Sequence, residues 1–344
     1  MNKRFGGISL GYPLLFIVGV PISVALTIGI SVWYGASGID LNTVMQALLH
    51  FDENNIQHQI IIHSRLPRVC GALLIGALLA VAGALMQGMT RNPLASPSIM
   101  GVSDGSVVAI TLCMIMLPGA SSLAMVIYSL LGSAVGAGIV FGLAWLLPGG
   151  TSPVRMAILG TIVGTFLGGI AEAAATYFQI SQSVSFWYNA RLNQIDPALL
   201  KLVLPLALAG LVLALLLARS ITVLAMGDEI AAGLGQRTVF IKGLAMLAVV
   251  LLTGSAVAIA GKIAFVGLIV PHMTRYLVGT DYRKVIPCCA WLGALFLGWC
   301  DLISRWLNTP FETPIGVVTA LFGVPFFLYL IRRKGGKAYE ASAK

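Results

Sequence analysis

Charged residues are scarce in this chain. Only 10% of its 344 residues are Asp, Glu, Lys or Arg, whereas 58% are hydrophobic. A soluble globular domain carries about 25% charged residues. The composition therefore argues against an ordinary soluble domain and predicts a protein of the lipid bilayer. The net charge of +9 does not indicate nucleic-acid binding, because the basic residues are scattered between apolar segments and form no stripe with interleaved aromatics.

Metal-binding and disulfide patterns are also missing. The five cysteines form no C-x-x-C pair and lie within or beside apolar segments, where Cys behaves as a small hydrophobe. His50, His58 and His63 precede the second apolar segment at a spacing that fits no metal site. We therefore expect neither a metal site nor a disulfide framework.

The sequence has no phosphate-binding loop of the type G-x-x-x-x-G-K-[ST]. The nearest match is Gly261-Lys262-Ile263, but position 256 is Ala and Ile263 has no hydroxyl for magnesium. No catalytic constellation is present either. We expect that the chain is not an enzyme and binds no cofactor, so that a partner must bind ATP if ATP powers it.

Long apolar segments make up most of the chain. A helix that crosses the hydrocarbon core needs about 20 mostly apolar residues. We predict an all-α membrane protein with about ten such helices. The candidate segments are Pro13–Tyr34, Arg68–Gly88, Gly101–Leu117, Ser122–Leu147, Arg155–Phe178, Leu199–Ala218, Val239–Ala260, Ala264–Val278, Val285–Trp306 and Gly316–Ile331.

An even number of spans places both termini on one side of the membrane. Most Lys and Arg residues fall on the side that holds Lys3 and Arg4, and this bias predicts cytoplasmic termini. The apolar run after Arg4 lacks an A-x-A cleavage site, so we interpret it as a retained first helix.

Two short patterns suggest an inverted internal repeat. Ala80-Val-Ala-Gly83 is followed by Pro93, and Ala258-Ile-Ala-Gly261 is followed by Pro271 at the same spacing. The second and seventh predicted helices run in opposite directions, so the two halves would be inverted. Inverted repeats with helices broken by Gly or Pro are typical of transporters.

One polar stretch, residues 219–237, interrupts the apolar sequence on what the topology makes the cytoplasmic side. It contains the acidic pair Asp228-Glu229, and Ile230, Ala231 and Leu234 are spaced to share one face of a short helix. Three glycines are expected to let the chain turn tightly: Gly227, Gly233 and Gly235. We interpret this stretch as a docking element for a soluble partner.

Glu172 is a carboxylate inside the fifth predicted span, and the polar residues Thr176 and Gln179 follow it. An intramembrane carboxylate is costly and usually faces a cavity or a partner. Glu172 therefore either faces a transport pathway or makes a hydrogen bond between helices. Asp301 and Arg305, four residues apart, are expected to pair. Asp104 is expected either to cap or to pair near the cytoplasmic end of the third helix.

A compact basic group, Arg65-Leu-Pro-Arg68, lies at the expected outer entry to the second helix. Arginine presents a planar fork suited to carboxylates, so this group can dock an acidic protein surface. The alternative is an interfacial anchor whose side chains extend toward the membrane surface.

A series of motifs from Arg65 to Phe327 resembles the permease subunits of ABC importers for iron-siderophores, haem and cobalamin, which have the type II importer fold. The motifs are Arg65-Leu-Pro-Arg68, Gly83-Ala-Leu-Met-Gln87, Arg91-Asn-Pro-Leu-Ala95, Pro97 with Gly101-Val-Ser103, Gly227-Asp-Glu with Leu234-Gly235, Gly261-Lys-Ile-Ala-Phe-Val-Gly-Leu-Ile-Val-Pro-His272 with Arg275, Asp301 with Arg305, and Pro314-Ile-Gly-Val-Val318.

The resemblance implies a single permease domain over residues 1–344 that pairs with a second permease, identical or homologous, in the cell membrane of a bacterium. It also implies two cytoplasmic ATPase subunits that bind ATP and magnesium, and an external substrate-binding protein. Residues 219–237 would be the cytoplasmic coupling loop.

Site residues follow from the same resemblance. The ATPase-coupling residues would be Gly227, Asp228, Glu229, Ala231, Leu234 and Gly235. Arg65, Arg68 and Arg305 would receive acidic residues of the binding protein, and the fifth helix with Glu172, Thr176 and Gln179 would line or flank the pathway.

We therefore expect an ATP-driven importer of a ferric siderophore, with haem or cobalamin as the alternative substrate. A different class, a secondary transporter driven by an ion gradient with Glu172 as its proton site, is the competing hypothesis.

Overall fold

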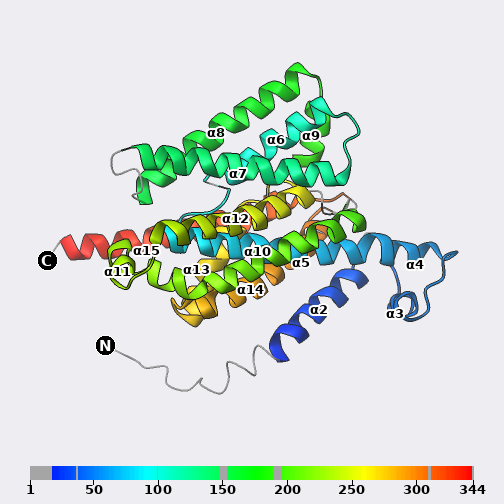
Figure 1. Ribbon diagram of the computed structural model, residues 1–344. Coiled ribbons are helices and arrows are strands. Elements are labelled where there is room, and N and C mark those ends of the chain that lie inside the picture. The colour runs from blue at the N-terminus through cyan, green and yellow to red at the C-terminus, as the bar shows by residue number, and fades with distance from the viewer. Residues whose placement is uncertain are drawn as a thin grey trace.

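The computed structural model describes residues 18–35, 38–98, 100–147, 153–188, 192, 195–308 and 311–342. Within these residues every regular element is a helix, as expected from the composition (Figure 1). Each of the ten apolar segments overlaps a helix, although residues 13–17 of the first segment lie outside the described residues. The helices are α2 (Val20–Trp33), α5 (Leu66–Thr90), α6 (Val102–Met116), α7 (Ser122–Leu146), α8 (Pro153–Tyr177), α10 (Pro197–Leu224), α12 (Thr238–Ala260), α13 (Val266–Val278), α14 (Tyr282–Trp306) and α15 (Ile315–Ser342).

Six helices in the described part of the chain are long and apolar enough to cross a membrane: the helix that ends with α5, together with α7, α8, α10, α12 and α14. The helices α2 and α6 and the stretch Ile315–Tyr329 of α15 are apolar but shorter. The fold is therefore an all-helical membrane-protein bundle.

The second predicted helix begins much earlier than expected. The short α4 (Ile56–Ile60) leads into a π-helical turn, η2 (Ile61–Arg65), which continues directly into α5. Together they form one helix of 35 residues. Pro67 lies inside this continuous helix, directly after the π turn, where the regular hydrogen-bond ladder is already interrupted. The expected helix entry at Arg65–Arg68 was therefore wrong.

Shorter helices not expected from apolar length connect the bundle. They are α3 (Leu41–Leu49), α9 (Ser181–Tyr188) and α11 (Asp228–Gly233). In Figure 1, α6, α7, α8 and α9 lie together on one side of α5, α10 and α12, while α3 and α4 lie at the opposite end of the molecule from α11. We call these two ends the α4 end and the α11 end.

Helix α5 lies at the centre of the bundle and packs against α10, α12, α13 and α14. Nearly all of its residues are buried. Its glycines allow this packing: a Cβ at Gly76 would overlap the carbonyl of Gly293, and a Cβ at Gly83 would overlap the backbone of Gly267. Small residues on facing helices let backbones approach closely where side chains cannot fit.

Helix contacts in the first half of the chain (α2 to α8) resemble those in the second half (α10 to α15). Helix α5 of the first half packs on α14 of the second, and α12 of the second half packs on α7 of the first. Within the first half α6 packs on α8, and within the second half α13 packs on α15. The two short helices α6 and α13 also correspond, and each begins after a left-handed residue, Gly101 (φ 74°) or Phe265 (φ 69°).

The two sequence patterns that suggested a repeat do not mark equivalent positions. Gly83 lies inside α5, whereas Gly261 caps the C-terminus of α12. Pro93 precedes α6, whereas Pro271 lies inside α13. Those two sequence patterns therefore do not support the predicted inverted repeat.

Candidate functional site

The polar stretch 219–237 forms a compact projection at the α11 end. Helix α10 continues through its first part to Leu224, and α11 follows after a short turn. The turn before α11 requires glycine at position 227, because other residues rarely adopt its φ of 142°. After α11 the chain turns at Gly235, which also has a positive φ, 79°. Gly233 instead is the last residue of α11 and has no positive φ, so its predicted role in turning was wrong.

The apolar residues of α11 divide between two environments. Ala231 is fully buried and anchors α11 on the bundle, whereas Ile230 and Leu234 remain 48% and 69% exposed. The expectation that all three share one face was therefore wrong. Ile230 and Leu234, one helical turn apart, are left as an apolar surface, and exposed apolar surface on a projecting element indicates a contact with a partner.

Charged contacts fix α11 to its neighbours. Asp228 Oδ2 lies 2.9 Å from Lys242 Nζ on α12 and 3.7 Å from Arg91 Nη2, just after α5. Glu229 is exposed and makes no hydrogen bond or ion pair with any residue that the structure describes. The first carboxylate of the acidic pair thus holds the helix in place, and the second is available to a partner.

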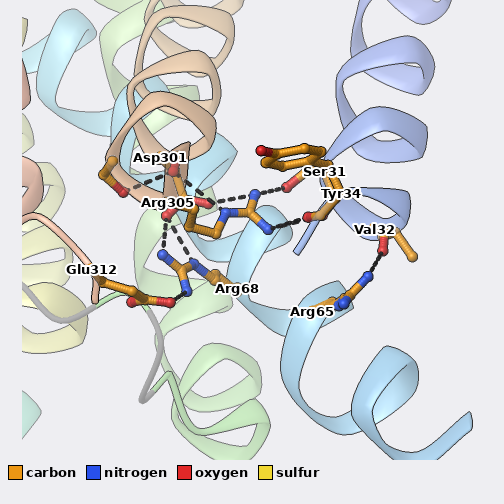
Figure 2. Close-up of polar contacts among 9 residues, drawn as sticks. Ser31, Val32, Tyr34, Arg65, Arg68, Asp301, Arg305 and Glu312 are labelled. Carbon is orange, nitrogen blue, oxygen red and sulfur yellow. Dashed lines mark hydrogen bonds and ion pairs between the residues drawn. The ribbon is translucent and has the colours of Figure 1, made fainter. Parts of the chain in front are cut away.

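A cluster of buried charges lies at the α4 end (Figure 2). Arg68 Nε donates to Asp301 Oδ1 at 2.8 Å, and Arg68 Nη1 donates to Glu312 Oε1 at 2.6 Å. Arg305 Nη2 lies 3.0 Å from Asp301 Oδ2, which confirms the expected pairing of these two residues. Asp301 is only 1% exposed, so its charge is compensated by two arginines away from bulk solvent.

Two of the arginines also bind the C-terminal end of α2. Arg305 Nη1 donates to the carbonyls of Ser31 and Tyr34 at 3.0 and 2.9 Å, and Arg65 Nη1 donates to the carbonyl of Val32 at 2.7 Å (Figure 2). The last carbonyls of a helix have no partner within it, so both guanidinium groups act as caps.

The structure brings the three expected docking arginines together at one end, but it buries them. Arg65 is 6% exposed, and Arg68 and Arg305 are each 7% exposed. Their partners lie in the same chain, which the sequence did not reveal. Glu312 was not predicted from the sequence, because no motif includes it. Its side chain is 34% exposed, more than that of its partner Arg68. Reception of an acidic protein by these arginines stays a prediction.

Two cavities follow one another along α8. One, of about 450 Å³, is lined by residues that include Glu172, Thr176 and Ser181. The other, of about 320 Å³, is lined by residues that include Thr161, Thr165 and Lys262, and Gly168 lines both. The cavities are therefore adjacent on the same face of this helix.

The pathway candidates do not all line these cavities. Glu172 is exposed, and its carboxylate makes no hydrogen bond or ion pair with the described residues; Thr176 lies one turn away and donates to the Glu172 backbone carbonyl at 2.8 Å. Gln179 lies beyond the end of α8 at φ 56° and does not line either cavity. Two hypotheses were open for Glu172. Its place in the cavity lining fits the hypothesis that it faces a pathway. The hypothesis of a hydrogen bond to another helix does not fit, because its carboxylate makes none with the described residues.

Asp104 and Lys262 form an ion pair beside the second cavity. Asp104 lies in the first turn of α6 and is 4% exposed, and Lys262 lies in the segment between α12 and α13. Of the two roles expected for Asp104, capping or pairing, the structure shows the ion pair. The sequence did not predict Lys262 as its partner, because the two residues are 158 positions apart and no motif links them.

Comparisons with known proteins agree with one another. The model of the FecCD transport family matches residues 23–333. The iron-uptake system permease protein FeuB of Bacillus subtilis is 57% identical over 94% of this chain and 97% of its own length. The iron(3+)-hydroxamate import system permease protein FhuB of the same organism is 50% identical over 89% of this chain and 79% of its own. A solved inward-facing conformation of a metal-chelate type ABC transporter superposes with a TM-score of 0.78 at 28% identity, covering 94% of this chain and 99% of that one.

Proposed function

This chain belongs to the FecCD transport family, and on that basis we propose that it is the permease of an ABC importer for ferric siderophores. It is an integral membrane protein of the bacterial cell membrane. Hydrolysis of ATP belongs to separate ATPase subunits, two of which bind the permease pair from the cytoplasm. An external binding protein delivers the ferric chelate.

The observation that carries this proposal is the tethered projection α11. It is fixed by buried Ala231 and by the Asp228–Lys242 ion pair, and it presents Ile230, Leu234 and Glu229 outward. A rigid element with an exposed apolar pair and a free carboxylate can pass movement of a bound ATPase to the helices α10 and α12 on either side of it.

The α11 end is then cytoplasmic and the α4 end external. The similar helix contacts of the two halves support an inverted repeat, in which α5 and α12 occupy equivalent places. The two cavities along α8 form part of the translocation pathway, with Glu172 and Thr176 on its wall. Their small and polar lining suits a ligand that must pass without being held.

The ATPase contact is tested by Leu234→Asp in the permease expressed with its ATPase subunits. Because a charge would replace an exposed apolar contact, we expect fewer ATPase subunits to copurify and ferric-siderophore uptake to fall. Leu49→Asp is the matched control, since Leu49 is similarly exposed, at 68%, on α3 near the other end. ATPase copurification that is unchanged in Leu234→Asp would contradict the assignment of α11.

The purified permease and its ATPase subunits also distinguish an ABC importer from a secondary transporter. An ABC importer loses uptake when the ATPase subunits are left out of proteoliposomes, even with an ion gradient imposed. Uptake that persists without them would show a secondary transporter instead.

A further inference from the structure

A third cavity, of about 390 Å³, lies at the α11 end, away from α8. It forms where the ends of α5, α10, α13 and α14 meet, and its lining includes Gln87, Arg91, Thr222, Arg275 and Tyr282. Its volume is in the range of small-molecule sites. Passage along α8 does not use this cavity; it borders the 219–237 stretch and shares Arg91 with the contacts that hold α11.

Arg275 gives the cavity a positive charge that the described chain does not balance. Its Nη2 donates to Gln87 Oε1, while the Gln87 amide donates to the carbonyls of Gly267 and Leu268 at 3.1 and 3.3 Å. The side chain of Tyr282 also interacts with Arg275. Gln87 and Tyr282 thus hold the guanidinium, but neither supplies a carboxylate. Arg275 Nη1 is buried without a hydrogen-bond acceptor among the described residues. A partly buried cation without a counter-ion is costly, and a bound anion would remove that cost.

The second cation is Arg91, which caps α5 in a left-handed conformation at φ 52°. The carboxylate nearest to it is Asp228 at 3.7 Å, and that carboxylate makes a closer contact, 2.9 Å, with Lys242. Arg91 is therefore only weakly neutralised. Its side chain is 43% exposed, so it can turn toward a ligand.

The remaining carboxylate nearby is also engaged. Asp281 lies before α14 and accepts hydrogen bonds from the Arg283 side chain, whose contact lowers the pKa of the Asp281 carboxyl below its usual range. Asp281 stays ionised but bound to Arg283. Among the residues that the structure describes, the cavity lining therefore holds two arginines and no carboxylate.

We propose that this cavity binds a phosphate-bearing anion through Arg275 and Arg91. The planar guanidinium fork matches the oxygens of a phosphate group, and two such groups in one cavity favour a doubly contacted anion over a single carboxylate. The phosphate can belong to the head group of an anionic phospholipid or to a soluble phosphate compound, because the recognised chemistry is the same.

Binding is tested on the full chain purified with its ATPase subunits in detergent. Native mass spectrometry would follow titration with phosphatidylglycerol, with zwitterionic phosphatidylcholine as the lipid control, and separately with glycerol 3-phosphate. Charge-assisted hydrogen bonds contribute about 1.5–3 kcal/mol, so we expect Arg275→Gln to weaken binding by about ten- to a hundredfold. Arg237→Gln is the matched control, an exposed arginine at the same end that does not line the cavity.

A second variant guards against misfolding, because Arg275 is packed against Gln87. Arg91→Gln changes an exposed side chain and is expected to weaken binding while leaving the melting temperature unchanged. Selective retention of phosphatidylglycerol would identify a lipid head group, and retention of glycerol 3-phosphate a soluble ligand. The proposal is overturned if the assembled importer retains neither, or if Arg237→Gln weakens binding as much as the cavity variants.

Discussion

The carboxylate of Asp301 lies 2.8 Å from the guanidinium of Arg68, a residue 233 positions earlier in the sequence. This contact joins α14 to α5 at the α4 end. The same carboxylate also meets Arg305, whose other hydrogen bonds reach the end of α2. One buried acid therefore determines how three helices meet.

Replacement of Asp301 by Asn should destabilise the protein strongly. Removing one partner of a buried ion pair leaves the other charge uncompensated, which costs about 3–5 kcal/mol. Thermal unfolding of the purified chain measures the effect. Glu312→Gln is the control, because Glu312 is partly exposed and its loss leaves Asp301 in place, so the melting temperature should fall much less. Equal shifts for the two variants would contradict a central role for Asp301.

Replacement of Gly83 by Ala should also destabilise the bundle. The added methyl group would meet the backbone of Gly267, which cannot move as a flexible side chain can. Overpacking of this kind costs about 1–3 kcal/mol. Gly138→Ala on α7 is the matched control, since nothing lies within 4 Å of its added carbon. Its stability should be unchanged or slightly higher, as Ala favours a helix.

The glycines around α11 should differ in their tolerance of Ala. Gly227 at φ 142° and Gly235 at φ 79° adopt backbone conformations that cost other residues about 1–3 kcal/mol, whereas helical Gly233 does not. We expect Gly227→Ala to lower ATPase copurification and Gly233→Ala to leave it unchanged. The reverse order would show that the shape of the turn is unimportant for the contact.

Transport should depend on the Asp104–Lys262 ion pair, because each side chain neutralises the charge of the other beside the second cavity. Lys262→Met removes the cation paired with the almost buried Asp104, so uptake should fall, and Asp104→Asn in the same chain should restore part of it. Residues in direct contact show coupling energies of about 0.5–3 kcal/mol in double-mutant cycles, which unfolding measurements on the four chains would test. Additive effects on stability would show that the pair is not coupled.

The predicted docking role of the arginines calls for a substitution that does not reverse a buried charge. Arg65→Gln keeps hydrogen-bonding capacity for the carbonyl of Val32 but removes the cation. If the arginines receive acidic residues, binding-protein affinity should fall, and more at low salt, where charges are less screened. Glu312→Gln removes a negative charge from the same end and should not weaken binding. An Arg65→Gln affinity equal to the parent at low salt would refute the docking role.

Apolar length was enough to predict where the helices lie, since the described part of each of the ten segments overlaps a helix. It was not enough to predict their ends. The helix containing α5 begins at Ile56 in a polar region, and α10 continues through Arg219 to Leu224. Helical hydrogen bonding does not require apolar side chains, so helices extend past the segments that hydropathy selects.

Pairing within a helix could be predicted, but pairing across the fold could not. Asp301 and Arg305 are four residues apart, and their contact follows from helix geometry. Arg68 with Glu312, and Asp104 with Lys262, are brought together only by packing of distant segments. The burial of the three arginines at the α4 end depends on these contacts, which is why the sequence predicted an exposed group.

The helix from Ile56 to Thr90 has a further consequence. Its 35 residues span about 50 Å, well beyond a hydrocarbon core of about 30 Å. Arg65 and Arg68 lie toward one end, and Arg91, in contact with Asp228, follows its other end directly. The helix therefore links the arginine cluster at the α4 end directly to the Arg91–Asp228 contact at the α11 end, and the π turn with Pro67 is the place along it where bending is expected.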